Sequence, residues 1–104
     1  MKKCCDMKGF LSFTVLRLIS KKNMSGQEIT EVIKKRRGTR PSPGTIYPVL
    51  KSLREYGWIE EIKDGGKEKK YRVTKRGLKE VKIATKKFVG MFYDMHSEFE
   101  RLNK

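Results

Sequence analysis

The stretch that decides the fold is residues 42–71, SPGTIYPVLKSLREYGWIEEIKDGGKEKKY. It begins with Ser42 and Pro43, a pair that favours the start of a helix. Its apolar residues then recur at spacings of three and four, which places them on one face of that helix. These residues are Ile46, Val49, Leu50 and Leu53. Gly57 follows and is expected to end the helix.

Two short β-like runs complete the stretch, at residues 58–63 and 69–74. Between them lies Asp64-Gly65-Gly66, where glycines can adopt the positive φ angles that a tight hairpin turn requires. A helix with one exposed face, followed by a basic hairpin, is the order of parts in a winged helix-turn-helix. The predicted fold is therefore mainly α with a small β-hairpin (α+β), and its expected use is reading DNA.

Two further helices are predicted before this stretch. Apolar side chains cover nearly the whole circumference of residues 9–21, so this helix should be buried on more than one side. Ser25 and Glu28 have the capping-box spacing for a second helix, whose basic end complements the helix dipole and which Gly38 stops. The turn at residues 38–41 is short, so the second and third helices should cross steeply.

Pro48 is the awkward residue of the third helix, because a proline inside a helix loses a hydrogen bond and clashes with the preceding turn. We therefore expect the regular helix to begin near Thr45, as its N-cap, with Pro48 in the first turn. Free N–H groups around Ile46 and Tyr47 would then form a seat for a phosphate.

The face opposite the apolar stripe is the candidate DNA-reading surface. Small residues at its start permit close approach, Tyr47 and Ser52 can hydrogen-bond, and Lys51 can reach a phosphate or a guanine edge. An equally weighted alternative is that Tyr47 only packs against the hairpin or the second helix, and we expect Trp58 to cover the core. The candidate DNA-binding residues are Arg40, Ser42, Gly44, Thr45, Tyr47, Pro48, Lys51 and Ser52 on or near the helix, with Lys67, Lys69, Lys70 and Arg72 in the hairpin.

Composition supports a polyanionic partner. The 104 residues allow one compact domain, and 26 Lys and Arg against 12 Asp and Glu give a formal charge of +14, which would draw nucleic acid from a distance. We expect no membrane span and no signal peptide. One histidine and no nucleophile or phosphate-loop motif argue against an enzyme. Cys4 and Cys5 favour free thiols in a reducing cytoplasm over a redox switch, and we expect no metal or cofactor.

The chain resembles the PadR family of transcriptional regulators. The resemblance is carried by Gly44-Thr45-Ile46-Tyr47-Pro48-Val49-Leu50, by Leu53, Gly57 and Ile59, and by Tyr71-Arg72-Val73-Thr74 with Gly77. It covers residues 9–77, and the tyrosine-proline pair is its most distinctive mark. It implies a dimeric winged-helix protein, usually a repressor, whose C-terminal helix packs on the partner's N-terminal helix. Where the family often has His-Gly-Tyr, this chain has Ser25-Gly26-Gln27.

The remaining residues independently predict a dimer. Thr74 can cap a helix whose apolar residues keep a three-four alternation over four heptads, too long a stripe for one small domain to cover. We therefore divide the chain into a DNA-binding domain at residues 1–77 and a dimerisation helix at residues 78–104. The partner could supply either a coiled-coil helix or its first helix. The candidate dimer residues are Phe10, Phe13, Leu78, Val81, Phe88, Phe92, Met95, Phe99 and Leu102.

The expected function is sequence-specific binding of double-stranded DNA by a homodimer on a partly palindromic operator. Two alternatives remain at this point. A sequence-indifferent architectural protein would bind all duplexes alike, and a winged helix can also serve to contact other proteins. Relatives in the family often respond to small aromatic molecules, so Phe88, Phe92 and Tyr93 could line an effector site. We favour the view that they are interface core, because a helical seam uses aromatic residues in any case.

Overall fold

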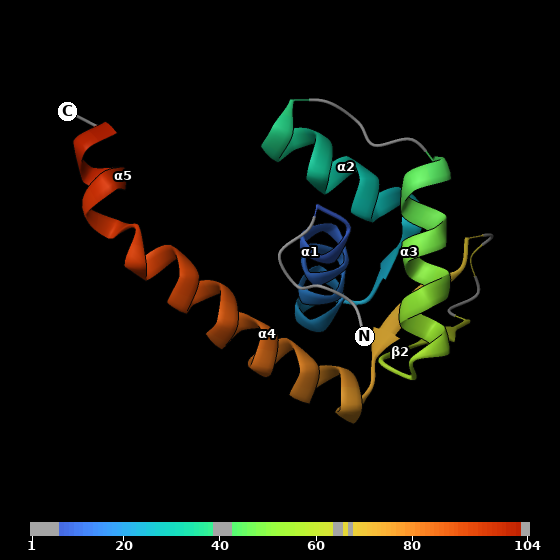
Figure 1. Ribbon diagram of the computed structural model, residues 1–104. Coiled ribbons are helices and arrows are strands. Elements are labelled where there is room, and N and C mark those ends of the chain that lie inside the picture. The colour runs from blue at the N-terminus through green and yellow to red at the C-terminus, as the bar shows by residue number, and fades with distance from the viewer. Residues whose placement is uncertain (1–6, 39–42, 64–65, 67, 103–104) are drawn as a thin grey trace.

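A computed structural model describes residues 7–38, 43–63, 66 and 68–102 (Figure 1). In chain order its elements are α1 (Met7–Lys21), β1 (Met24–Ser25), α2 (Gly26–Arg37), α3 (Pro43–Glu55), β2 (Ile59–Ile62), β3 (Lys70–Val73), α4 (Lys75–Asp94) and α5 (His96–Leu102). We call α1, α2, α3 and the sheet the body, and α4 with α5 the tail. Figure 1 shows the tail running along one side of the body and then beyond it.

Helix α1 is the centre of the body. Its Val15 and Ile19 are at most 1 % exposed, and Figure 1 shows α2, α3 and α4 arranged around it. The prediction that this helix is buried on more than one side is confirmed. The core consists of Val15, Leu16, Leu18, Ile19, Ile29, Ile33, Ile46, Leu50, Leu53, Ile59 and Tyr71.

Helix α2 begins and ends as the sequence predicts. The Glu28 N–H donates to Ser25 Oγ (3.1 Å), and the Ser25 N–H donates to Glu28 Oε1 (2.9 Å), so the capping box is complete. At the other end Gly38 has a φ of 82°, and its N–H donates to the Lys34 carbonyl (2.7 Å). Glycine adopts this left-handed conformation without steric cost, which is why the helix ends there.

The sheet has one more strand than the hairpin predicted from the sequence. Its order is β1-β3-β2, all antiparallel, with Ser25 opposite Lys70 and Ile59 opposite Val73. A two-residue strand leaves no alternation for a sequence pattern to reveal, so β1 was missed. Tyr71 is buried whereas Arg72 is exposed, so neighbouring side chains of β3 face opposite sides of the sheet.

Helix α3 begins two residues earlier than expected. It starts at Pro43, so the prediction of Thr45 as the N-cap is wrong, and Pro48 lies inside the helix. Pro48 cannot donate to the carbonyl of Gly44 four residues before. Gly44 is exposed, so water can satisfy that carbonyl and the helix can continue through the proline.

The end of α3 is confirmed at Gly57, which has a φ of 78°. The Gly57 N–H donates to the Arg54 carbonyl (2.9 Å), and the Trp58 N–H donates to the Leu53 carbonyl (3.0 Å). These two bonds form a Schellman motif, which turns the chain sharply from α3 into β2. Trp58 packs against the core and stacks on Tyr56 at 4.6 Å, as expected of a residue that covers the core.

The tail differs from the expected single helix. Thr74 caps α4 as predicted, because its Oγ1 accepts from the Gly77 N–H (3.1 Å). At Met95, however, the N–H donates to the Phe92 carbonyl three residues back (3.0 Å), and this tight turn separates α4 from α5. The apolar spacing continues through the turn, so periodicity could not reveal the interruption.

Part of the predicted dimer seam packs inside the chain itself. Phe88 is only 7 % exposed, and its ring lies 4.7 Å from Phe13 and 5.7 Å from Phe10 of α1. Val81 also packs against the core. The expectation that a partner is needed to cover the whole stripe is therefore wrong for Val81 and Phe88, which the chain's own body covers, whereas Leu78 is 44 % exposed.

Candidate nucleic-acid interface

Helix α3 presents a polar face to solvent. Gly44, Thr45, Tyr47, Pro48, Lys51 and Ser52 are all exposed, whereas Ile46, Leu50 and Leu53 are at most 2 % exposed. This predicted division of the helix is confirmed. The exposed face follows from the sequence spacing, and the buried stripe holds it at a fixed orientation on α1 and α2.

Tyr47 packs against α2, which is one of the two roles considered for it, and it also stays partly exposed. Its side chain is 52 % exposed, yet its ring lies on the first residue of α2. A Cβ on Gly26 would be 3.0 Å from Tyr47 Cε1 and 3.1 Å from its Oη. Gly26 therefore leaves the space in which the ring rests, while half of the side chain stays available to a ligand.

The wing, which comprises β2, β3 and their connection, carries basic residues that lie near carboxylates. Arg72 donates to Glu60 Oε2 through Nη2 (2.7 Å) and Nε (2.9 Å). Lys69 Nζ lies 3.9 Å from Glu61 Oε2, and Lys70 Nζ lies 4.0 Å from Glu28 Oε1. The sequence did not reveal these pairs, although the hairpin register places Glu60 opposite Arg72. The positive charge of the wing is thus partly neutralised within the chain.

A further ion pair joins the wing to α3. Arg54, in the last turn of α3, donates from Nη1 to Glu61 Oε2 on β2. Tyr71 of β3 lies beside this pair. Burial raises the pKa of the Tyr71 phenol above its usual value, and the negative charge of Glu61 raises it further. The phenol is therefore neutral and available as a hydrogen-bond donor at physiological pH.

Two shallow depressions flank the start of α2. The one beside Tyr47 has a volume of about 290 Å³ and is lined by Ser25, Gly26, Gln27, Tyr47, Glu68, Lys69 and Tyr71. The other has a volume of about 420 Å³ and is lined by Lys22, Met24, Gln27, Glu28, Glu31, Val32 and Glu68.

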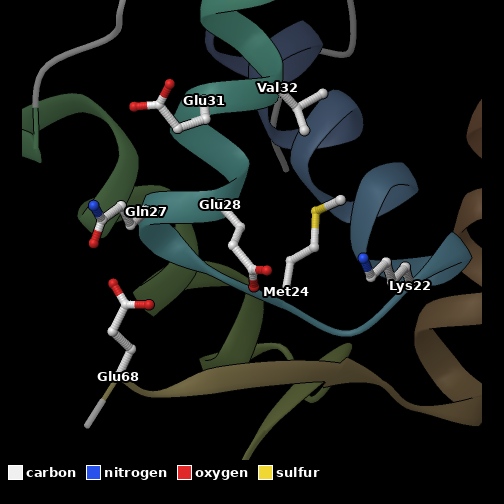
Figure 2. Close-up of a pocket in the computed structure, with 7 residues that line it drawn as sticks. All are labelled: Lys22, Met24, Gln27, Glu28, Glu31, Val32 and Glu68. Atoms are coloured by element: carbon white, nitrogen blue, oxygen red, sulfur yellow. The ribbon is translucent and has the colours of Figure 1, made fainter. Parts of the chain in front are cut away.

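The larger depression is unsuited to a phosphate. Figure 2 shows Glu28 and Met24 near its centre, with Glu68 pointing from the wing side toward α2. The backbone N–H of Ser25 lowers the pKa of Glu28, so this carboxyl stays ionised to a lower pH than usual. Carboxylates repel DNA, and this depression therefore marks an edge of the candidate interface.

Several predicted residues cannot be placed. Arg40, Ser42 and Lys67 lie outside the described residues, as do Cys4, Cys5 and the Asp64-Gly65 part of the turn. Over the described ranges, no group of three or more potential ligand side chains could hold a metal ion. Within the same part of the chain, no helix is long and apolar enough to cross a membrane.

The sequence profile of the PadR-like family of transcriptional regulators matches residues 15–83. The chain belongs to this family. The matched span runs from the buried part of α1 through α3 and the wing to the first half of α4, so it includes the whole candidate interface. The resemblance seen in the sequence is confirmed.

Known proteins are similar to this PadR-like chain in sequence or in structure. An uncharacterized protein X from Lysinibacillus sphaericus is 35% identical over 77 residues, covering 68% of this chain and 71% of that protein. A PadR-like transcriptional regulator from Bacillus cereus is 27% identical, with a TM-score of 0.75 over 89% of this chain and 93% of that one. A PadR family transcription regulator from hypervirulent Clostridium difficile is 22% identical, with a TM-score of 0.73 over 88% and 99%.

Family membership makes this chain a DNA-binding transcription regulator, and the family consists of regulators rather than enzymes. The predicted fold, mainly helical with a small antiparallel sheet in a winged helix, is also confirmed.

Proposed function

We propose that this PadR-like protein is a homodimeric repressor that binds a pseudo-palindromic operator. The observation that carries the proposal is the exposed face of α3 lying beside the wing. In this proposal α3 is the recognition helix and enters the major groove, while the wing lies along the phosphate backbone.

The roles of individual residues follow from their exposure. Lys51 and Tyr47 are on the exposed face of α3, where they can reach base edges or phosphates. Lys69 and Lys70 carry positive charge in the wing. On DNA binding they would exchange their neighbouring carboxylates for phosphates. We therefore assign specificity to α3 and non-specific affinity to the wing.

The exposed apolar side chains of the tail support the homodimer. Phe92 is 43 % exposed, Met95 41 % and Leu102 81 %. Burying these side chains against a second copy would remove apolar surface from water, which is a favourable process. A two-fold dimer presents two recognition helices to half-sites about one helical turn, or ~34 Å, apart.

We assign Phe88, Phe92 and Tyr93 to packing and not to an effector site. Phe88 already fills the space against α1, and Phe92 stacks on it at 6.3 Å. Tyr93 is 74 % exposed and stacks on His96 at 5.9 Å. An effector would therefore have to bind between two copies. Repression is the simplest mode of action for so small a dimer, because occupying the operator blocks other proteins from that DNA.

Selection of bound sequences from a random DNA pool is the decisive experiment. We expect an enriched sequence with two symmetric halves. The logarithm of the binding constant should fall linearly with the logarithm of the salt concentration, with a slope of roughly −0.9 per phosphate neutralised. Enrichment of no sequence would favour the architectural alternative. Absence of any DNA binding would favour a protein-contact module.

Variants then separate the two surfaces. Tyr47→Ala or Lys51→Ala should narrow the difference in affinity between the selected operator and random DNA. Lys69→Ala or Lys70→Ala should weaken binding to both by the same factor. The two lysines Lys51 and Lys69 form a matched pair, since each variant removes one positive charge. If Lys51→Ala leaves the operator preference unchanged, α3 is not the reading element.

A further inference from the structure

One carboxylate, that of Glu61, connects the reading helix with both strands of the wing. Glu61 is on β2, and its Oε2 accepts from Arg54 Nη1 at the end of α3. Lys69 Nζ, next to β3, lies 3.9 Å from the same oxygen. Glu61 is also directly opposite Tyr71 of β3 in the register. The side chain thus stands where the three elements meet.

The neighbouring carboxylate, Glu60, makes a different connection. It accepts two hydrogen bonds from Arg72, at 2.7 and 2.9 Å, across the same hairpin. Both members of this pair belong to the wing, so the pair holds β2 to β3 but does not reach α3. Glu60 and Glu61 therefore have the same charge and adjacent positions, but only Glu61 bridges helix and wing.

We propose that Glu61 is a positioning residue that fixes the wing relative to α3 and thereby contributes to operator specificity. The inference rests on the proposed function, because it requires α3 and the wing to contact one DNA duplex together. Arg54 is the residue of α3 through which Glu61 acts. Glu61 itself, as a carboxylate, is not expected to contact DNA.

The physical reason is the difference between specific and non-specific binding. A specific complex requires α3 to be in register with base edges while the wing lies on the backbone of the same site. Non-specific binding needs only positive charge near phosphates and tolerates many orientations. A wing whose orientation is already fixed loses less conformational entropy when α3 contacts the bases and the wing contacts the backbone of the same site. Loss of the Arg54–Glu61 pair should therefore weaken operator binding more than random binding.

The first experiment compares Glu61→Gln with Glu60→Gln in the full chain. Each variant removes one negative charge from β2, so both should strengthen binding to a random duplex by the same factor. Only Glu61→Gln should reduce the ratio of operator to random affinity, by about three- to fivefold, which is what a partly exposed ion pair can contribute. Glu60→Gln should leave this ratio unchanged. Equal ratios in the two variants would overturn the inference.

A double-mutant cycle then tests whether the effect passes through Arg54. Arg54→Gln alone should lower the ratio by the same factor as Glu61→Gln. The double variant, Arg54→Gln with Glu61→Gln, keeps the net charge of the natural chain and should lose no more than either single variant. Additive losses would show that the two residues act separately and would overturn the inference.

Failure of the inference can be told apart from failure of the proposed function. If the natural chain itself does not prefer the operator over random DNA, the proposed function is wrong. If the natural chain has that preference and Glu61→Gln keeps it, only the positioning role is wrong. Thermal unfolding of each variant should stay close to that of the natural chain, because a half-exposed surface pair contributes little stability.

Discussion

The body and the tail of this protein bury their apolar side chains in opposite degrees. The core cluster belongs entirely to the body. Of the eleven exposed large hydrophobic side chains among the described residues, eight belong to the tail, counting Met95 between its two helices. The tail contributes Phe88 to the interior and leaves Phe92, one helical turn later, 43 % exposed. The body thus buries its apolar side chains within one chain, whereas the tail leaves much of its apolar surface exposed, as the proposed dimer would require.

The joint between the two regions is as tightly packed as the body. Thr74 Oγ1 donates to the Gly57 carbonyl (2.6 Å), and the Thr74 N–H donates to the Trp58 carbonyl (3.0 Å). Gly77 is buried against the same turn. A Cβ at this position would lie 2.1 Å from the Trp58 carbonyl oxygen and 2.8 Å from Val73 Cγ2.

The largest expected effect is at this joint. Gly77→Ala should lower the free energy of unfolding by about 3 kcal/mol, because backbone or α4 must shift to make room. Gly90→Ala in the tail is the matched control. No atom lies within 4 Å of its would-be Cβ, so it should raise stability by about 0.5–1 kcal/mol. Denaturant unfolding measures both changes in the free energy of unfolding. Similar changes in the two variants would contradict the contrast between joint and tail.

The next effect concerns the proposed dimer. Phe92→Asp should turn the dimer into monomers and weaken operator binding on the order of 100-fold, because the two half-sites are then bound independently. Sedimentation and operator titration measure the two consequences. Ser97→Asp adds the same charge at an exposed polar position of α5 and should change neither. A Phe92→Asp dimer with full affinity would show that the exposed apolar tail is not the interface.

A smaller effect is expected from the cap of α2 in the body. Ser25→Ala should lower the free energy of unfolding by about 1 kcal/mol, since it removes the Oγ that accepts from the Glu28 N–H. Thermal unfolding measures this loss. Ser97→Ala at an exposed site in the tail is the control and should have almost no effect. Equal losses of stability in Ser25→Ala and Ser97→Ala would mean that the cap at Ser25 does not stabilise the body.

The smallest effect is the pH dependence from Glu28. Its pKa is lowered from the usual value of 4.5, chiefly by the hydrogen bond from the Ser25 N–H. A lowered pKa in the folded state stabilises the fold above the unfolded pKa, and this contribution disappears as the pH falls through the folded value. The melting temperature of Glu28→Gln should therefore be below that of the natural chain at pH 7 and should approach it in acid. A constant difference would contradict this assignment.

The sequence predicts the body better than the tail, for physical reasons. Ser25, Gly38 and Gly57 are local signals that determine helix ends through their own backbone geometry, and all three predictions are confirmed. The third-helix start was misplaced because Pro48 can be accommodated where the preceding carbonyl is exposed. The break at Met95 leaves the apolar spacing intact. A periodic pattern specifies which side of a helix is apolar, but it does not specify what covers that side.

The interface was predicted in its exposed residues but not in its charges. The polar face of α3 follows from the spacing of Ile46, Leu50 and Leu53. The partners of Arg54 and Arg72 depend on which residues the fold brings together, and Glu61 was not singled out beforehand. Only the hairpin register, once known, places Glu60 opposite Arg72.

The bond between Thr74 Oγ1 and the Gly57 carbonyl joins the N-cap of α4 to the turn that follows α3. Because this joint is closely packed, the start of α4 has a fixed position relative to the body, and the length of α4 determines where its far end lies. Each residue added to it between the joint and Phe88 would move the far end by about 1.5 Å and rotate it by roughly a quarter turn or more. In the proposed dimer, the distance between the two recognition helices would therefore depend on the length of α4, which lies away from the DNA.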